Sequence, residues 1–167
     1  MAAGFFNSPE QVIMLGSVAV SLGLLLFAVD WRYFRDWIVV YLFKMSIDLV
    51  LASVAVESGL MSYPVRYFSR YFDTSILFEA LVFPTLCVLY NQVARARGAG
   101  AAVFYGLLFG VGITFLEYPI ELYTDLIEYT GWTWYFTLFS ITILFLLSRV
   151  FIAFYRWGCG YFGRRLF

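Results

Sequence analysis

The sequence contains no histidine and few charged residues. Lys, Arg, Asp and Glu make up 13% of the 167 residues, and eleven basic residues balance eleven acidic ones. Without histidine the chain lacks the commonest metal ligand and proton-transfer side chain, which disfavours zinc, haem and Ser-His-Asp chemistry. Balanced charge also disfavours a nucleic-acid partner, which would attract an excess of Lys and Arg. We therefore expect no metal, no cofactor and no nucleic-acid partner.

The sequence also has few cysteines and lacks the basic region with which a cleaved signal peptide begins. The only two cysteines are Cys87, inside an apolar stretch, and Cys159, close to the C-terminus, so we expect no disulfide between them. No Lys or Arg precedes the first long apolar stretch, whereas a cleaved signal peptide begins with a basic region. We therefore expect this first stretch to be retained as a helix.

Apolar side chains are what the sequence has in abundance. They make up 63% of the residues, and aromatic side chains make up 22%, a composition that requires lipid. A helix that spans the ~30 Å hydrocarbon core needs about 20 mostly apolar residues. Five stretches qualify, at about 11–29, 37–56, 76–94, 98–116 and 132–155. The sequence predicts an all-α fold, in which residues 1–167 form a single domain of five transmembrane helices.

The positions of the cations predict the orientation of the bundle. Cytoplasmic loops carry the excess of Lys and Arg. If the turn between Asp30 and Asp36 is cytoplasmic, only Arg66 and Arg70 lie outside. The cations then on the cytoplasmic side are Arg32, Arg35, Lys44, Arg95, Arg97, Arg149, Arg156, Arg164 and Arg165. This bias predicts an external N-terminus and a cytoplasmic C-terminus in a cell membrane.

Small residues recur along the fourth stretch, with Gly106 and Gly110 four residues apart. Glycines at this spacing allow another helix backbone to approach closely in lipid. We expect them to pack against the chain's own helices, and a homo-oligomer formed through the same face is the alternative.

Three charged residues lie within the second and fifth stretches. Lys44 and Asp48 are four residues apart and share one helix face, and Arg149 is expected at a similar depth near the inner leaflet. A charge in the hydrocarbon costs at least ~2.5 kcal/mol, so each must find a partner, a cavity or an interface. We predict one buried ion network of Lys44, Asp48 and Arg149. An ion or proton path, or simple snorkelling of the cations, are alternatives.

A second group of acids lies near the outer ends of the third and fourth stretches. Glu79 and Glu117 are expected at similar depth, and Glu121 follows one helical turn after Glu117. Pro84 and Pro119 lie close by and distort helices. The pattern predicts a cavity open to the outer side. The candidate ligand-binding residues are Glu79, Glu117, Glu121, Tyr118, Trp132 and Trp134. The alternative is that Arg66 or Arg70 neutralises the acids in structural ion pairs.

Several short motifs carry a resemblance to a known family. They are Asp30-Trp-Arg-Tyr-Phe-Arg, Ser62-Tyr-Pro-Val-Arg66, Phe78-Glu79-Ala-Leu-Val-Phe-Pro84, Tyr90-Asn-Gln92, Phe115-Leu-Glu117-Tyr-Pro119 and Gly131-Trp-Thr-Trp-Tyr135. Between Asp30 and Trp157 the chain resembles a family of small multi-span membrane proteins found mostly in spore-forming Firmicutes. The resemblance implies a bacterial plasma-membrane protein and adds weight to Glu79 and Glu117, but it brings no activity with it.

Three functions fit these observations. The first is a protein whose acidic, ring-lined cavity binds or translocates a cationic or amphipathic small molecule or lipid. The second is a structural or assembly subunit of a membrane complex. The third is an intramembrane enzyme in which a carboxylic acid protonates an isoprenoid or lipid substrate. The bilayer is the one certain partner, and the sequence leaves open whether the protein is an enzyme.

Overall fold

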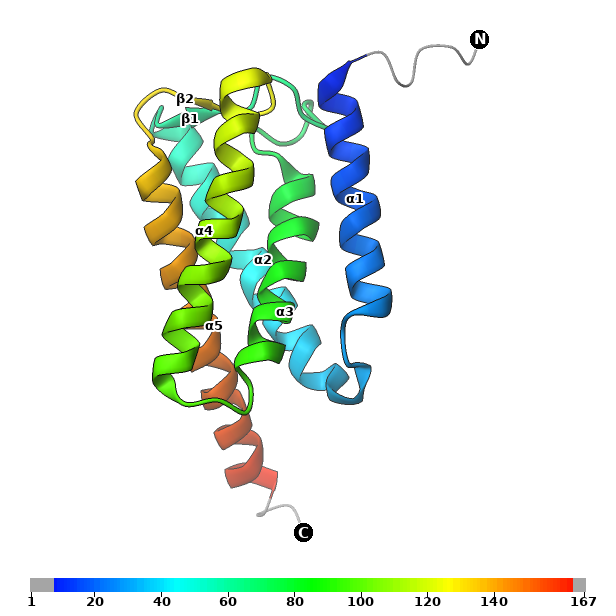
Figure 1. Cartoon of the computed structure of the whole chain (residues 1–167), viewed down its shortest axis with the longest axis vertical. Coiled ribbons are helices and arrows are strands. Elements are labelled where there is room, and N and C mark those ends of the chain that lie inside the picture. Colours follow the sequence, from blue (N-terminus) through cyan, green and yellow to red (C-terminus); the bar gives the residue numbers. More distant parts are fainter. Residues whose placement is uncertain (1–7, 164–167) are drawn as a thin grey trace.

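The computed structural model describes residues 8–163, which form a bundle of five helices with one short sheet (Figure 1). The helices are α1 (Pro9–Phe27), α2 (Phe34–Glu57), α3 (Phe83–Ala94), α4 (Ala99–Tyr123) and α5 (Trp134–Gly163). A 3-10 turn, η1 (Trp31–Tyr33), precedes α2, and a π-helical turn, η2 (Phe78–Val82), leads directly into α3. Strands β1 (Met61–Ser62) and β2 (Glu128–Tyr129) pair antiparallel. The predicted all-α bundle is confirmed.

Four helices are long and apolar enough to cross a membrane. These are Pro9–Phe27, Trp31–Glu57, Ala99–Tyr123 and Trp134–Tyr161. The remaining apolar helix, η2 with α3 (Phe78–Ala94), is shorter than the other four. The structure therefore has the number of helices that the sequence predicts, and four of them meet the length of a membrane span.

Local sequence explains where the helices begin and end. The Ser8 side chain accepts a hydrogen bond from the Gln11 backbone N–H at 3.4 Å and so caps α1. Gly59, with φ of +67°, ends α2, because glycine adopts this left-handed conformation without strain. α4 was predicted to end at Leu116 but continues through Pro119 to Tyr123, where Thr124 closes it by bonding the Ile120 carbonyl. A proline this close to a helix end disturbs few backbone hydrogen bonds.

α3 is the central helix and packs against α1, α2, α4 and α5. Its buried Tyr90 ring stacks on Phe145 of α5, with centroids 5.2 Å apart. Polar side chains also join these two helices, since Cys87 and Asn91 both donate to the Ser148 hydroxyl, at 3.1 and 2.8 Å. A core that is partly polar and fully buried fixes the register of α3 on α5.

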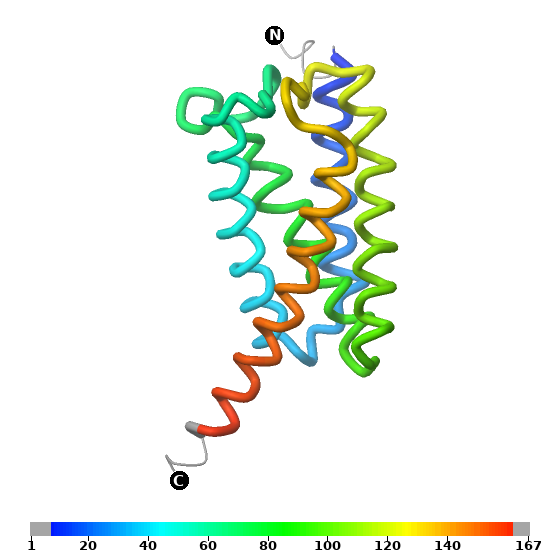
Figure 2. Tube along the Cα trace, turned by 90° about the vertical axis from the view of Figure 1, so that its left-hand side faces the viewer, coloured from blue at the N-terminus to red at the C-terminus, as the bar shows by residue number. Residues whose placement is uncertain are grey.

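The bundle is not equally tight along its length. Near one end α2 and α5 are in contact, where Phe43 stacks on Phe151 with centroids 4.0 Å apart and Arg156 binds Asp36 at 2.7 Å. Toward the other end the two helices separate, and α5 leans toward α4 (Figure 2). That end also carries β1 and β2, and we call it the sheet end.

Gly106 and Gly110 face α5 within the same chain. A Cβ added at Gly106 would contact Leu146 at 3.6 Å, and one added at Gly110 would lie only 2.5 Å from the Thr142 hydroxyl oxygen. The two glycines therefore allow α4 to approach α5 closely. These glycines thus pack against the chain's own α5, and a homo-oligomer stays a prediction.

Candidate functional site

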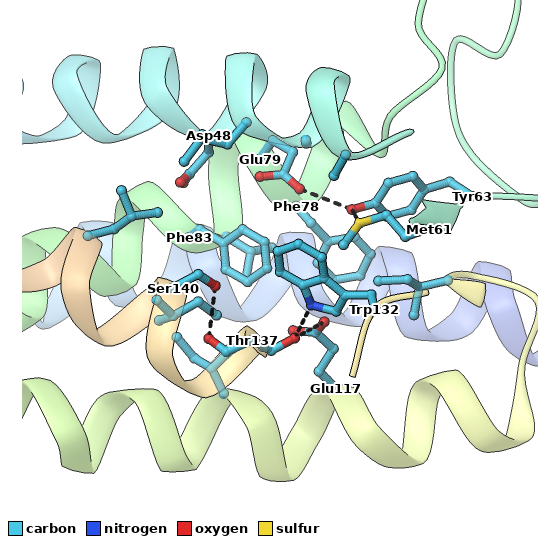
Figure 3. A pocket seen from close by; sticks show the side chains of 18 of the residues that line it. Asp48, Met61, Tyr63, Phe78, Glu79, Phe83, Glu117, Trp132, Thr137 and Ser140 are labelled. Carbon is cyan, nitrogen blue, oxygen red and sulfur yellow. Dashed lines mark hydrogen bonds between the residues drawn. The ribbon is translucent and has the colours of Figure 1, made fainter. Parts of the chain in front are cut away.

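A cavity of about 400 Å³ lies within the bundle toward the sheet end (Figure 3). Its walls come mainly from α2, η2, α4 and α5, and most of its lining side chains are apolar. Four charged residues also line it, namely Lys44, Asp48, Glu79 and Glu117. The cavity therefore brings together two charged residues from each of the groups that the sequence analysis placed at opposite leaflets.

Pro84 explains how the chain presents Glu79 at the cavity. Proline has no backbone N–H, so the Ala80 carbonyl one turn earlier loses its helical partner. This carbonyl instead accepts a hydrogen bond from the Tyr41 hydroxyl of α2 at 2.7 Å. The turn before Pro84 opens into the π-helical η2, a local widening often found at functional sites. Glu79 lies in this widened turn and is only 5% exposed.

Glu79 has few hydrogen-bond partners. The Tyr63 hydroxyl donates to Glu79 Oε1 at 3.4 Å, and no ion pair involves Glu79 in the described part of the chain. Tyr63 lies in the loop after β1. Burial, then the nearby carboxyl groups of Glu79 and Glu117, raise the pKa of Tyr63 well above its ordinary value, so this phenol stays a proton donor at neutral pH.

Glu117 projects from α4 into the same cavity and is held by a different set of donors. Tyr129 of β2 donates its hydroxyl to Glu117 Oε1, and the Thr137 hydroxyl of α5 donates to the same oxygen at 3.3 Å. Trp132 donates its indole N–H to Thr137 at 2.8 Å and so extends the network (Figure 3). Burial first, and then Glu117, raise the pKa of Tyr129, which remains protonated.

Lys44 and Asp48 form a buried ion pair on the α2 wall. The Lys44 ammonium binds Asp48 Oδ1, and the side chains are only 2% and 4% exposed. The ammonium also lies 5.6 Å from the ring centroids of Phe83 and Phe145, which favours the charge through cation–π attraction. Asp48 Oδ2 is buried and has no hydrogen-bond partner among the described residues. One oxygen of the Asp48 carboxyl group thus has no hydrogen-bond donor beside it in the described chain.

Arg149 is not part of this pair. Its guanidinium donates to the Arg95 carbonyl at 2.9 Å, and no bond joins it to Lys44 or Asp48 within residues 8–163. Arg95 caps the C-terminus of α3, where free carbonyls carry partial negative charge and attract a cation. The predicted three-residue network is therefore wrong for Arg149, because similar depth does not place a side chain on the same face.

Arg66 does not neutralise the cavity acids either. It binds Asp73 at 3.1 Å and donates to the carbonyls of Tyr63 and Phe72, at 2.7 and 2.8 Å. Arg70 is exposed. The structure therefore contradicts the alternative in which Arg66 or Arg70 forms an ion pair with Glu79 or Glu117.

Three of the predicted ligand-binding residues lie away from the cavity. Tyr118 and Trp134 are exposed, and Glu121, although one turn from Glu117, is not among the lining residues. Consecutive helical residues point about 100° apart, so Tyr118 turns outward when Glu117 turns inward. Trp134 lies where an interfacial anchor is expected. Of the three aromatic residues predicted to bind a ligand, Trp132 alone is among the lining residues.

Tyr129, Thr137 and Met61 were missed by the sequence analysis. Strand β1 brings Met61 and Tyr63 over the cavity. Its partner strand β2 carries Tyr129 toward Glu117. Thr137, a hydroxyl one turn into an apolar helix, was the only usable signal among them. The strands are two residues each, too short for an alternating pattern to reveal their pairing.

Buried and exposed side chains both line the cavity at the sheet end. Met61, Tyr63, Leu126 and Ile127 are buried there, whereas Leu60 is 37% exposed. The most exposed lining residue is Leu116 of α4, at 66%, and the exposed Leu51 and Val54 line it from α2. All three belong to helices of membrane-spanning length and are apolar. The entrance at the outer side stays a prediction.

The donor set in this cavity is carboxyl, phenol, hydroxyl and ammonium, and no group of three or more His, Cys, Asp or Glu residues suited to a metal is found in the part of the chain that the structure describes. The resemblance to membrane proteins of spore-forming Firmicutes stays a prediction. Comparison with known protein families, with curated proteins and with solved structures finds no match to this chain.

Proposed function

We propose that this chain is a multi-pass protein of the bacterial cell membrane that binds, or carries across, an amphipathic, lipid-like small molecule in the cavity between its helices. One observation carries the proposal. Glu79 is buried and Glu117 half-buried in a mostly apolar cavity, and neither is paired with an arginine or lysine in the described chain. Carboxyl groups are costly there, which makes intramembrane acids candidates for a functional role.

The shape of the cavity supports a small-molecule ligand. Its volume of about 400 Å³ falls within the range of about 300–1,000 Å³ typical of small-molecule sites. Apolar walls with a few convergent polar groups are also typical of such sites. A purely structural subunit would be expected to fill this space and to pair its acids, as Arg66 pairs with Asp73 in the neighbouring loop.

The membrane placement is part of the same proposal. We infer five spans with the N-terminus outside, since η2 with α3 extends about 25 Å at 1.5 Å per residue and lies at the centre of the bundle. At the end opposite the sheet, Arg32 and Arg35 lie at the turn into α2, and Arg95 and Arg97 lie in the connection from α3 to α4. By the distribution of Lys and Arg, that end is cytoplasmic.

Filling the cavity tests the proposal. Ala52 lines the cavity from α2, and Ala52→Leu adds three carbons to that space. We expect the parent protein, purified from membranes and analysed by native mass spectrometry, to retain a bound amphiphile that Ala52→Leu loses. Ala153→Leu makes the same change at an exposed position of α5 and should retain it. Equal amounts of bound lipid in both variants, with equal thermal stability, would contradict the proposal.

A further inference from the structure

We propose that the carboxyl groups lining the cavity, those of Asp48 and Glu79 on one side and of Glu117 across from them, select the protonated amine of a single-chain amphiphile and reject phosphate-bearing lipids. This inference rests on the function proposed above, and names the class of ligand for the same site.

The balance of charge in the cavity favours a cation. Three carboxyl groups line it, against the single ammonium of Lys44. That ammonium is already bound to Asp48 Oδ1 and packed between two rings. An anionic head group would bring a charge that the already paired Lys44 cannot compensate in this low-dielectric site. A protonated amine can be compensated, because a carboxyl group beside it ionises.

The unsatisfied oxygens favour a cation that donates hydrogen bonds. Asp48 Oδ2 is buried without a partner, and the one hydrogen bond to Glu79 is a long one from Tyr63. Asp48 on α2 and Glu79 on η2 belong to elements packed against each other, and Figure 3 shows both side chains at the same side of the cavity. A primary ammonium has three N–H donors and can satisfy both carboxyl groups, whereas a quaternary ammonium has none.

The aromatic side chains beside these carboxyl groups also suit an ammonium head group. Phe78, Phe83 and Trp132 line the cavity beside the acids. Ring faces attract cations, and the attraction grows when the site excludes water. An inorganic cation is a poorer fit, because it requires six or more oxygen ligands and this cavity is mostly apolar.

The exposed part of the cavity lining suits a hydrocarbon tail. Leu51, Val54 and Leu116 are exposed lining residues on membrane-spanning helices. With its amine at Glu79 and Asp48, a single-chain amphiphile would extend its tail past these residues into the lipid. The head group then lies against Asp48 and Glu79, and the tail lies among apolar side chains.

Four ligands that share a dodecyl chain test the head-group selectivity on the unmodified protein. We expect native mass spectrometry in detergent to show dodecylamine binding most strongly, dodecanol and dodecyltrimethylammonium more weakly, and dodecyl phosphate least. Equal binding of dodecylamine and dodecyl phosphate would overturn the inference. If dodecanol binds as well as dodecylamine and Ala52→Leu abolishes both, the amphiphile site stands and the amine selectivity falls. If none of the four binds, both proposals fall.

A charge-neutral variant provides the second test. Glu79→Gln keeps the shape of the side chain and should weaken dodecylamine binding by about tenfold or more while leaving dodecanol binding unchanged. Glu57→Gln removes the same charge at the exposed end of α2, outside the cavity, and should change neither. Should Glu79→Gln fail to fold, Glu117→Gln takes its place with the same expectation. An unchanged preference for dodecylamine in a folded variant would overturn the inference.

Discussion

Lys44 and Asp48 are the clearest case of a local pattern that the structure realises. Four residues apart on one helix, they meet on the same face, as the sequence indicated, and both are almost fully buried. Burial makes the pair a poor source of net stability, because desolvating two charges offsets most of their attraction. Its presence on the wall of a cavity suggests that the charges serve the cavity rather than the fold.

Removing one partner of this pair should be costly, and removing both should not. Asp48→Ala leaves a buried ammonium without its counter-charge, and we expect the free energy of unfolding to fall by about 3–5 kcal/mol. The double variant Lys44→Met with Asp48→Leu should recover most of that loss, since apolar residues of similar volume often replace a buried pair without penalty. Reversible unfolding in detergent micelles measures both.

Glu57→Ala, at an exposed position of α2, is the control for this experiment and should leave the free energy of unfolding almost unchanged. A parent-like stability of Asp48→Ala would mean that water or lipid head groups reach Lys44, and the pair would then not be desolvated as the structure has it.

Other residues of the site lay beyond what the sequence indicates. Depth along a helix can be counted from the chain, and Glu79 and Glu117, which were expected at similar depth, do line one cavity. Which face of a helix points into the bundle depends on how the helix is rotated about its axis. The sequence does not show this rotation, so the predicted positions of Arg149, Tyr118 and Trp134 were wrong. Residues brought in by loop pairing, such as Tyr129, leave no periodic signal at all.

Among the elements, η2 and α3 link sequence to site most directly. Pro84 removes one backbone donor, the preceding turn widens, and Tyr41 of α2 takes over the freed Ala80 carbonyl. The sequence indicated a distortion near Glu79 but not that a neighbouring helix would stabilise it. The backbone irregularity is thus placed where it lines a cavity, which is where membrane proteins tolerate it.

The contact between α4 and α5 depends on Gly110. A methyl group there would lie 2.5 Å from the Thr142 hydroxyl oxygen and 3.3 Å from a Leu138 methyl, so α4 would have to move away from α5. We expect Gly110→Ala to lower the thermal unfolding temperature and to cost about 1–3 kcal/mol, as overpacking of a tight contact usually does. Thermal unfolding in detergent, followed by circular dichroism, measures this.

Gly112 offers a matched control two residues away on the same helix. Nothing lies within 4 Å of a Cβ added there, and the residue is exposed. Gly112→Ala should therefore be neutral or slightly stabilising, because alanine favours helices over glycine. Equal stability of the two variants would show that α4 does not approach α5 as closely as the structure has it.

At the scale of the whole molecule, the cavity arises from the relative tilt of its helices. α2 and α5 touch where Phe43 stacks on Phe151 and diverge toward the sheet end, and β1 and β2 close the space between them at that end (Figure 2). The number and approximate position of the helices follow from apolar stretches in the sequence. The divergence does not, because it depends on contacts between residues more than a hundred positions apart, such as Asp36 and Arg156.

The orientation of this bundle in the membrane yields the last prediction. Ser69, in the loop after β1, and Ala96, between α3 and α4, are both exposed and lie at opposite ends of the bundle. In a Cys159→Ser background, whose remaining Cys87 is buried, each can be replaced by cysteine. Because cations concentrate at the Ala96 end, we expect a membrane-impermeant maleimide to label Ser69→Cys in intact bacterial cells, and Ala96→Cys only after permeabilisation. The reverse pattern would invert the molecule and put the cavity acids nearer the cytoplasmic face, whereas labelling of both sites in intact cells would mean that the chain between them does not cross the membrane.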